Sequence, residues 1–194
     1  MDVLLIGIGL GLAFVAGVRA FLPLALAALF AALGFIGLTL PFVGAGGDGW
    51  WPVFGVLAAL SVAEAVLDKI GGLERAFNIV MVPVRALAGG ILFAAGGGFE
   101  VGAASLPWLV VGAVIAGVVA VLKVLLRPPA AGASSGVSTS FLSFIEDLVG
   151  LIGGAIAIFV PFLPGLLVAF LLFFFSRIRK RRGRKFGGLR ILGD

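Results

Sequence analysis

Four acidic residues lie inside apolar stretches of the sequence, at Glu64, Asp68, Glu146 and Asp147. Glu64 and Asp68 are four residues apart, so on a helix their carboxylates project from one face. The glycine pair at 71–72 predicts the end of that helix, where the partial negative charge of the helix terminus is unfavourable for acids. Other parts of the molecule must therefore compensate for them. If these carboxylates form a site, it would bind a cation or carry a proton, and Glu146 and Asp147 would complete it.

Basic residues elsewhere in the chain are the expected partners of these acids: Arg19, Lys69, Arg85, Lys123 and Arg127. Charges in an apolar setting are normally paired, so a structural ion-pair network is the alternative to a binding site. Lys123 and Arg127 also suit the last turn of a helix, where cations are favourable. Ser143 with Glu146 matches a helix capping box, which gives Glu146 a structural explanation. The sequence leaves both alternatives open.

The residue types that are absent restrict the chemistry further. The sequence contains no Cys, His or Tyr. This excludes disulfides, thiolate and imidazole metal ligands, and catalytic triads built on histidine. We therefore expect no enzyme activity, no cofactor and no metal site.

The composition is that of an integral membrane protein. Of 194 residues, 62% are apolar and only 12% are charged. Soluble domains are about half apolar and about one quarter charged, and a domain this small could not bury so much apolar surface. We therefore predict an all-α polytopic membrane protein rather than a soluble one.

Apolar segments predict the positions of the membrane-spanning helices. A spanning helix needs about 20 mostly apolar residues. The candidate segments are 3–22, 24–43, 50–69, 84–99, 107–127, 141–160 and 162–176. They predict a bundle of seven crossings, or six if residues 84–99 enter the membrane and return. Small residues spaced by four, such as Gly9, Ala13 and Gly17, predict close helix packing.

The charge distribution predicts the orientation of the bundle. Residues 177–194 hold eight basic residues and one acid, whereas residues 1–176 hold six basic residues and eight acids. With seven crossings and a cytoplasmic C-terminus, every basic connection also falls in the cytoplasm, as the positive-inside rule requires. The N-terminus is then outside. Trp50, Trp51 and Trp108 would lie at the outer membrane boundary, where tryptophan is favoured.

The chain divides into a transmembrane bundle over residues 1–176, with a flexible cytoplasmic loop at about 128–140, and a basic cytoplasmic tail over 177–194. A basic cluster directly after a spanning helix is expected to contact anionic lipid headgroups, and no nucleic-acid recognition fold accompanies it. The residues expected to contact these lipids are Arg177, Arg179, Lys180, Arg181, Arg182, Arg184 and Lys185. A homo-oligomer is compatible with the sequence.

Several short motifs resemble a known family, the bacterial multi-pass membrane proteins with domain of unknown function 4126. They are residues 9–12 and 16–24, Glu64 with 68–70, residues 85–89, and Ser143 with 146–147. The resemblance extends to about residue 176. It implies a helical membrane protein of the bacterial cytoplasmic membrane, and it implies no activity. The chain departs from the family pattern at Arg19, where a polar amide is expected, and at Gly71 and Ala86, where prolines are expected.

Two functions fit these observations. The first is a small permease or channel-like protein for an ion or small solute, with optional proton coupling through the intramembrane carboxylates. The second is a lipid-binding or scaffold protein whose buried charges only pair helices. Transport predicts a polar cavity that reaches Glu64 and Asp68, whereas the scaffold predicts that these acids are paired and dry.

Overall fold

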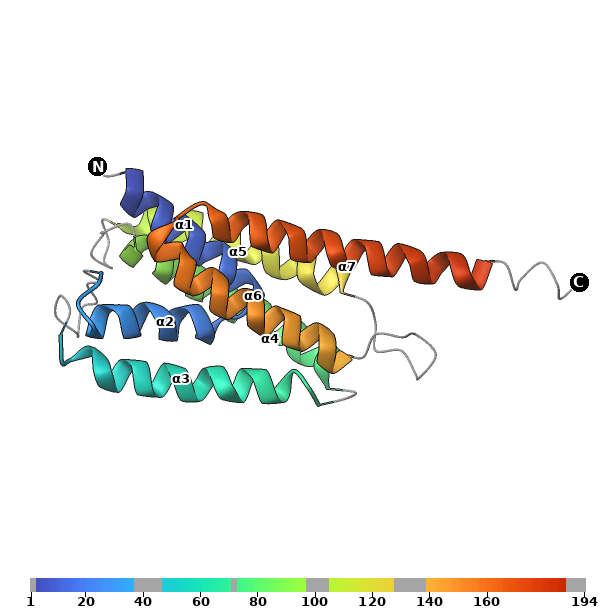
Figure 1. Cartoon of the computed structure of the whole chain (residues 1–194), viewed down its shortest axis with the longest axis horizontal. Coiled ribbons are helices and arrows are strands. Elements are labelled where there is room, and N and C mark those ends of the chain that lie inside the picture. Colours follow the sequence, from blue (N-terminus) through green and yellow to red (C-terminus); the bar gives the residue numbers. More distant parts are fainter. Residues whose placement is uncertain (1–2, 37–46, 71–72, 97–104, 128–138, 188–194) are drawn as a thin grey trace, which may run out of the picture.

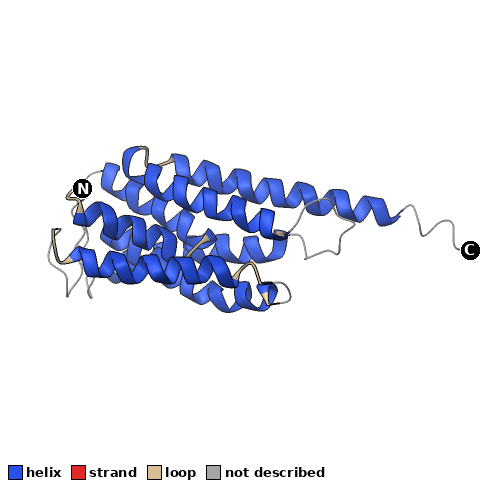
Figure 2. Cartoon of the chain, turned by 60° about the horizontal axis from the view of Figure 1, so that its bottom comes forward, coloured by secondary structure: helices blue, strands red, loops and turns tan. Residues whose placement is uncertain are grey.

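The computed structural model describes residues 3–36, 47–70, 73–96, 105–127 and 139–187. These ranges contain seven α-helices and no strand (Figures 1 and 2). The helices are α1 Val3–Val18, α2 Phe21–Ala32, α3 Trp50–Leu67, α4 Glu74–Gly96, α5 Leu106–Leu126, α6 Thr139–Phe159 and α7 Leu163–Gly187. The predicted all-α helix bundle is therefore confirmed.

Four of these helices are long and apolar enough to cross a membrane: α3, α4, α5 and α6. The chain is thus a membrane protein with several apolar helices. By contrast, α1 has 16 residues and α2 has 12, which corresponds to about 24 Å and about 18 Å, against a hydrocarbon core of about 30 Å. The number of crossings and the side of the membrane that each end faces stay predictions.

The first two segments end earlier than predicted. The predicted helices 3–22 and 24–43 end at Val18 and Ala32, and residues 37–43 lie outside the described ranges. The chain turns at Arg19 and Ala20, and α2 returns toward the end of the bundle at which α1 begins (Figure 1). Pro23 is the third residue of α2, where its missing N–H removes no helical hydrogen bond.

The helix α1 forms the centre of the bundle. It packs against α4, α5, α6 and α7, whereas α2 packs between α3 and α6. The helix α3 lies at the edge of the bundle and contacts mainly α2 (Figure 1). Only Trp50 and Glu64 are buried in α3 itself. Trp50 packs α3 into the apolar core near its start, and Glu64 is the buried acid near its end.

Small residues bring helix backbones into close contact, as predicted. A Cβ atom on Gly112 of α5 would lie 2.5 Å from the carbonyl oxygen of Gly89 in α4. A Cβ atom on Gly17 of α1 would lie 2.7 Å from the carbonyl oxygen of Ala116. No side chain fits at either glycine without movement of a helix. These contacts position α1, α4 and α5, which carry much of the charge described below.

Three local predictions are corrected by the structure. Trp50 is 2% exposed and belongs to the apolar core with alanines of α2, so its ring packs inside the bundle and does not face outward. The fourth helix begins at Glu74 rather than at residue 84. Pro83 does not interrupt it, and the helix continues through this residue. The seventh helix does not stop at residue 176 but continues through the basic residues to Gly187.

One end of the bundle gathers the charged connections. The ends of α3 and α5, the beginnings of α4 and α6, and the basic extension of α7 all lie at this end (Figure 1). The positive-inside prediction places these connections on one side of the membrane, and which side that is stays a prediction. We call this end of the molecule the basic end of the bundle.

Candidate functional site

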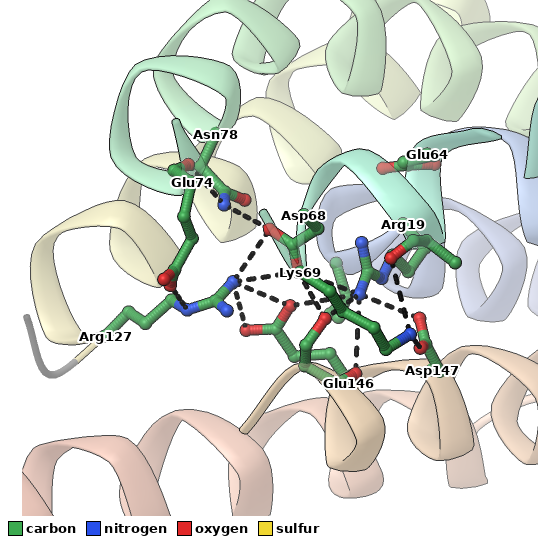
Figure 3. A network of polar contacts seen from close by, with 12 residues as sticks. Arg19, Glu64, Asp68, Lys69, Glu74, Asn78, Arg127, Glu146 and Asp147 are labelled. Carbon is green, nitrogen blue, oxygen red and sulfur yellow. Dashed lines mark hydrogen bonds and ion pairs between the residues drawn. The ribbon is translucent and has the colours of Figure 1, made fainter. Parts of the chain in front are cut away.

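Within the described ranges, eight charged residues are buried near the basic end of the bundle, and each residue is at most 7% exposed. Four are cations and four are anions, so their formal charges cancel. The cations are Arg19, Arg85, Lys123 and Arg127, and the anions are Glu64, Asp68, Glu74 and Glu146. We call these eight residues the charge network; Figure 3 shows most of it. They come from α3, α4, α5 and α6, from the turn between α1 and α2, and from the residues directly after α3 and α5.

The carboxylate of Glu64 caps the N-terminus of α2. Its Oε2 accepts hydrogen bonds from the backbone N–H groups of Ala20 at 3.0 Å and Phe21 at 3.2 Å. Its Oε1 accepts one from Arg85 Nη2 at 3.2 Å. A helix N-terminus carries partial positive charge and unsatisfied N–H groups, so a carboxylate is favourable there. Glu64 therefore joins α3 to the beginning of α2 and to α4.

The ammonium group of Lys123 occupies the matching position at the end of α1. Its Nζ donates to the backbone carbonyl of Val18 at 2.9 Å and lies 2.7 Å from Glu146 Oε2. A helix C-terminus carries partial negative charge, so a cation is favourable there. The turn at Arg19 and Ala20 is thus held on both sides, by Lys123 of α5 and by Glu64 of α3.

Asp68 contacts four side chains from other parts of the bundle. It caps the C-terminal end of α3 and is fully buried. Its carboxylate lies 2.9 Å from Arg19 Nη2 and 3.1 Å from Arg127 Nη1. It also accepts hydrogen bonds from Asn78 Nδ2 and, at 2.6 Å, from Ser143 Oγ. Two guanidinium groups therefore compensate for the acid that the helix terminus itself disfavours.

Arg127 connects three helices through one guanidinium group. Its Nε lies 2.7 Å from Glu74 Oε1, and its Nη1 lies 3.0 Å from Glu146 Oε1 and 3.1 Å from Asp68 Oδ1 (Figure 3). It caps the end of α5, whereas Glu74 begins α4 and Glu146 lies in α6. Removing one partner from such a buried group leaves an uncompensated charge, which typically costs about 3–5 kcal/mol.

An outer pair extends the charge network to the surface. Lys69 Nζ lies 2.8 Å from Asp147 Oδ2, and Asp147 Oδ1 lies 2.8 Å from Arg19 Nη2. The side chains of Lys69 and Asp147 are 39% and 24% exposed. This pair lies between the buried charges and the surface at the basic end.

Several buried polar atoms have no hydrogen-bonding partner within the described part of the protein. The donors among them that also lack an ion-pair contact are Arg19 Nε and Nη1, Arg85 Nε and Nη1, and Arg127 Nη2. The corresponding acceptors are Glu74 Oε2 and Asn78 Oδ1. Buried polar groups are normally hydrogen-bonded, so unpaired groups indicate capacity for a further partner. Here that capacity consists mainly of guanidinium N–H donors.

All nine residues predicted from the sequence are brought together in this region: Arg19, Glu64, Asp68, Lys69, Arg85, Lys123, Arg127, Glu146 and Asp147. However, Glu64 and Asp68 do not share a site, because each carboxylate binds its own basic partners. The described residues also contain no group of three or more acids placed to hold a metal ion.

The capping box predicted at Ser143 and Glu146 is wrong. The helix α6 begins at Thr139, so Ser143 lies inside it and donates its hydroxyl to Asp68 instead of capping the helix. Glu74, Asn78 and the binding role of Ser143 were not predicted. Glu74, Asn78 and Arg85 are separated by four and seven residues, which places them on one face of α4. That spacing could have identified the first two if the fourth helix had been predicted to begin earlier.

Comparison with protein families identifies the family of this chain. The model of the family described as "Domain of unknown function (DUF4126)" matches residues 6–181. The chain therefore belongs to this family, as its motifs predicted. Comparison with curated proteins and with solved structures gave no match.

Proposed function

We propose that this member of the DUF4126 family is a small permease of the bacterial cytoplasmic membrane, with the charge network as its solute-binding and gating element. The observation that carries the proposal is the turn at Arg19 and Ala20. Two helix ends meet there inside the bundle, and side chains of other helices hold both. In transporters, helix ends that lie inside the membrane commonly form the substrate site.

The unpaired guanidinium groups favour an anionic or oxygen-rich solute. The buried carboxylates are already engaged by basic groups, so a cation would have to compete with Arg19, Arg85, Lys123 and Arg127. In contrast, Arg19 and Arg85 each retain two guanidinium nitrogens without a partner. These donors suit a carboxylate, phosphate or similar acceptor. The proposed solute is therefore a hydrogen-bond acceptor, whereas the acidic residues alone led us to expect a cation.

The neutrality of the charge network supplies a reason for proton coupling. Adding a proton to any of its carboxylates leaves one excess positive charge in a buried setting, which is unfavourable without compensation. A bound anion would neutralise this charge. The proton and the anion would therefore enter together, and an inward proton gradient would drive anion uptake.

Flux measurements on reconstituted protein test this proposal. We would measure uptake of chloride, nitrate, phosphate and acetate, with sodium and potassium for comparison, into proteoliposomes with and without an imposed pH gradient. Arg85→Gln removes a buried guanidinium, and Arg75→Gln, at an exposed position of the same helix, is the matched control. We expect proton-driven anion uptake that Arg85→Gln abolishes and Arg75→Gln preserves, with both variants folded by circular dichroism. If the wild-type protein shows no flux for any of these solutes, the proposal that it is a permease is wrong.

The second candidate is the lipid-binding or scaffold protein, and the pairing of the four buried acids in the described ranges favours it. Each of the four buried carboxylates has at least one basic group within 3.2 Å. In that role the charge network only holds the helices together. The wild-type protein would then show no flux, while Arg85→Gln would still lower its thermal stability.

A further inference from the structure

An apolar groove lies between α6 and α7. Its volume is about 320 Å³, and four residues from each helix line it, from Ile145 to Ile152 and from Leu167 to Phe174. All eight are apolar. Ile152 is 40% exposed and Phe170 is 67% exposed. The groove is therefore part of the apolar surface that the bundle presents to the membrane.

The groove follows one face of each helix. Its lining positions recur every three or four residues on both helices, which is the spacing of a single helical face. The helices are connected by only three residues and run antiparallel, so Ile145 and Phe174 lie at the same end of the groove. Seven residues separate Ile145 from Ile152, which gives the groove a length of about 10 Å.

Positive charge lies at the Ile145–Phe174 end of the groove. Arg177 follows Phe174 by three residues and Phe170 by seven, so it lies on the face of α7 that forms the groove. Arg177, Arg179 and Lys180 are exposed. The N-terminus of α6, at Thr139, is at this end too, and it adds the partial positive charge of a helix terminus. One helix face thus continues from an apolar surface directly into a basic one.

We infer that this groove binds one molecule of an acidic phospholipid. An acyl chain lies along the apolar walls, and the phosphate contacts Arg177, with Arg179 and Lys180 beside it. Guanidinium groups form strong charge-assisted hydrogen bonds with phosphate, and basic residues next to a membrane-spanning helix attract anionic lipids. A second copy of the chain fits this surface less well, because two copies inserted in the same orientation would bring their basic α7 ends together. This lipid site does not depend on the proposed transport activity.

Native mass spectrometry of the full chain tests the site. The protein would be released from nanodiscs that contain equimolar phosphatidylglycerol and phosphatidylcholine with identical acyl chains, and the retained lipids counted. Leu148→Trp fills the groove, and Ile152→Trp is a second filling variant in case the first does not fold. Val118→Trp, at an exposed position of α5 outside the groove, is the matched control. Arg177→Gln with Arg179→Gln removes the charge, with Arg75→Gln as its control.

The expected result is a phosphatidylglycerol molecule retained by the wild-type protein, with at least about fivefold preference over phosphatidylcholine. The folded filling variant loses this lipid, whereas Val118→Trp and Arg75→Gln retain it. The double arginine variant loses the preference. Equal retention of the two lipids by the wild-type protein would overturn the inference, as would retention of the acidic lipid after filling. A dimer that the filling variant disrupts would show instead that a second copy occupies the groove.

Discussion

The carboxylate of Glu64 accepts a 3.0 Å hydrogen bond from the backbone N–H of Ala20, 44 residues earlier in the chain. A side chain of one helix thus caps another helix, in place of a capping residue next to it in sequence. The residue at the N-cap of α2 is alanine, which has no side chain that can accept this hydrogen bond. The beginning of α2 consequently depends on the position of α3.

Replacing Glu64 should separate its capping role from its ionic role. Glu64→Ala removes the hydrogen bonds to the α2 N-terminus and leaves Arg85 without its partner, so we expect the free energy of unfolding to fall by about 3–5 kcal/mol. Glu64→Gln keeps an amide oxygen that can accept from Ala20, so we expect a smaller loss. Unfolding in mixed detergent micelles measures both. Equal losses for the two variants would show that the cap contributes nothing.

Asp68→Asn should be among the most destabilising single changes at this end of the bundle. The substitution removes a buried negative charge that both Arg19 and Arg127 contact, at an expected cost of about 3–5 kcal/mol. Asp48→Asn removes the same charge from an exposed position and should change stability by less than about 0.5 kcal/mol. Thermal unfolding followed by circular dichroism compares the two variants. Similar melting temperatures would contradict the central place of Asp68 in the charge network.

The outer pair should contribute much less than the buried pairs. The side chain of Lys69 is 39% exposed, and exposed ion pairs are typically worth about 1 kcal/mol or less. We therefore expect Lys69→Gln to lower stability by less than about 1 kcal/mol and the difference to shrink with added salt. Unfolding at low and high salt checks this. A large and salt-independent loss would place Lys69 with the buried charges.

The contact between α4 and α5 should not tolerate a methyl group. In Gly112→Ala the new Cβ would collide with the Phe93 side chain and lie 2.5 Å from the Gly89 carbonyl oxygen. We expect a loss of about 1–3 kcal/mol, typical of overpacking. Gly55→Ala on α3 is the control, because nothing lies within 4 Å of its new Cβ. It should be neutral or stabilising by up to about 1 kcal/mol, because alanine favours helix. Unfolding measurements that rank the two variants in the opposite order would contradict this packing.

The sequence predicted the fold class well because apolar composition and segment length are strong signals. It also predicted which charged residues gather, because buried charges in a membrane protein must find partners. It could not predict the specific pairs. Glu64 binds backbone N–H groups of α2, and no local pattern at Ala20 or Phe21 indicates an acid 43 or 44 residues later.

Element boundaries were predicted less well, for physical reasons that differ between sites. The break at Arg19 and Ala20 lies within an apolar run, and tertiary contacts of Lys123 and Glu64 stabilise it. Pro23 lies after the break, in the first turn of α2. This proline indicates the region of the break but not the residue at which α1 ends. The opposite error occurred in the fourth segment, which was predicted to begin at residue 84, whereas α4 begins at Glu74 and continues through Pro83. Ser143 matched a local capping pattern, but a long-range acceptor, Asp68, determines where its hydroxyl points.

The neutrality of the charge network has a consequence for biogenesis. Of its eight charges, the α1–α2 segment carries one cation, the α3–α4 segment three acids and one cation, and the α5–α6 segment two cations and one acid. No segment is neutral on its own, and the total reaches zero only when all three are assembled. Each helix pair that leaves the translocon thus carries an unpaired charge that only other segments of the same chain can neutralise. Truncated or wrongly inserted chains would keep such charges unpaired in lipid, where they are energetically costly.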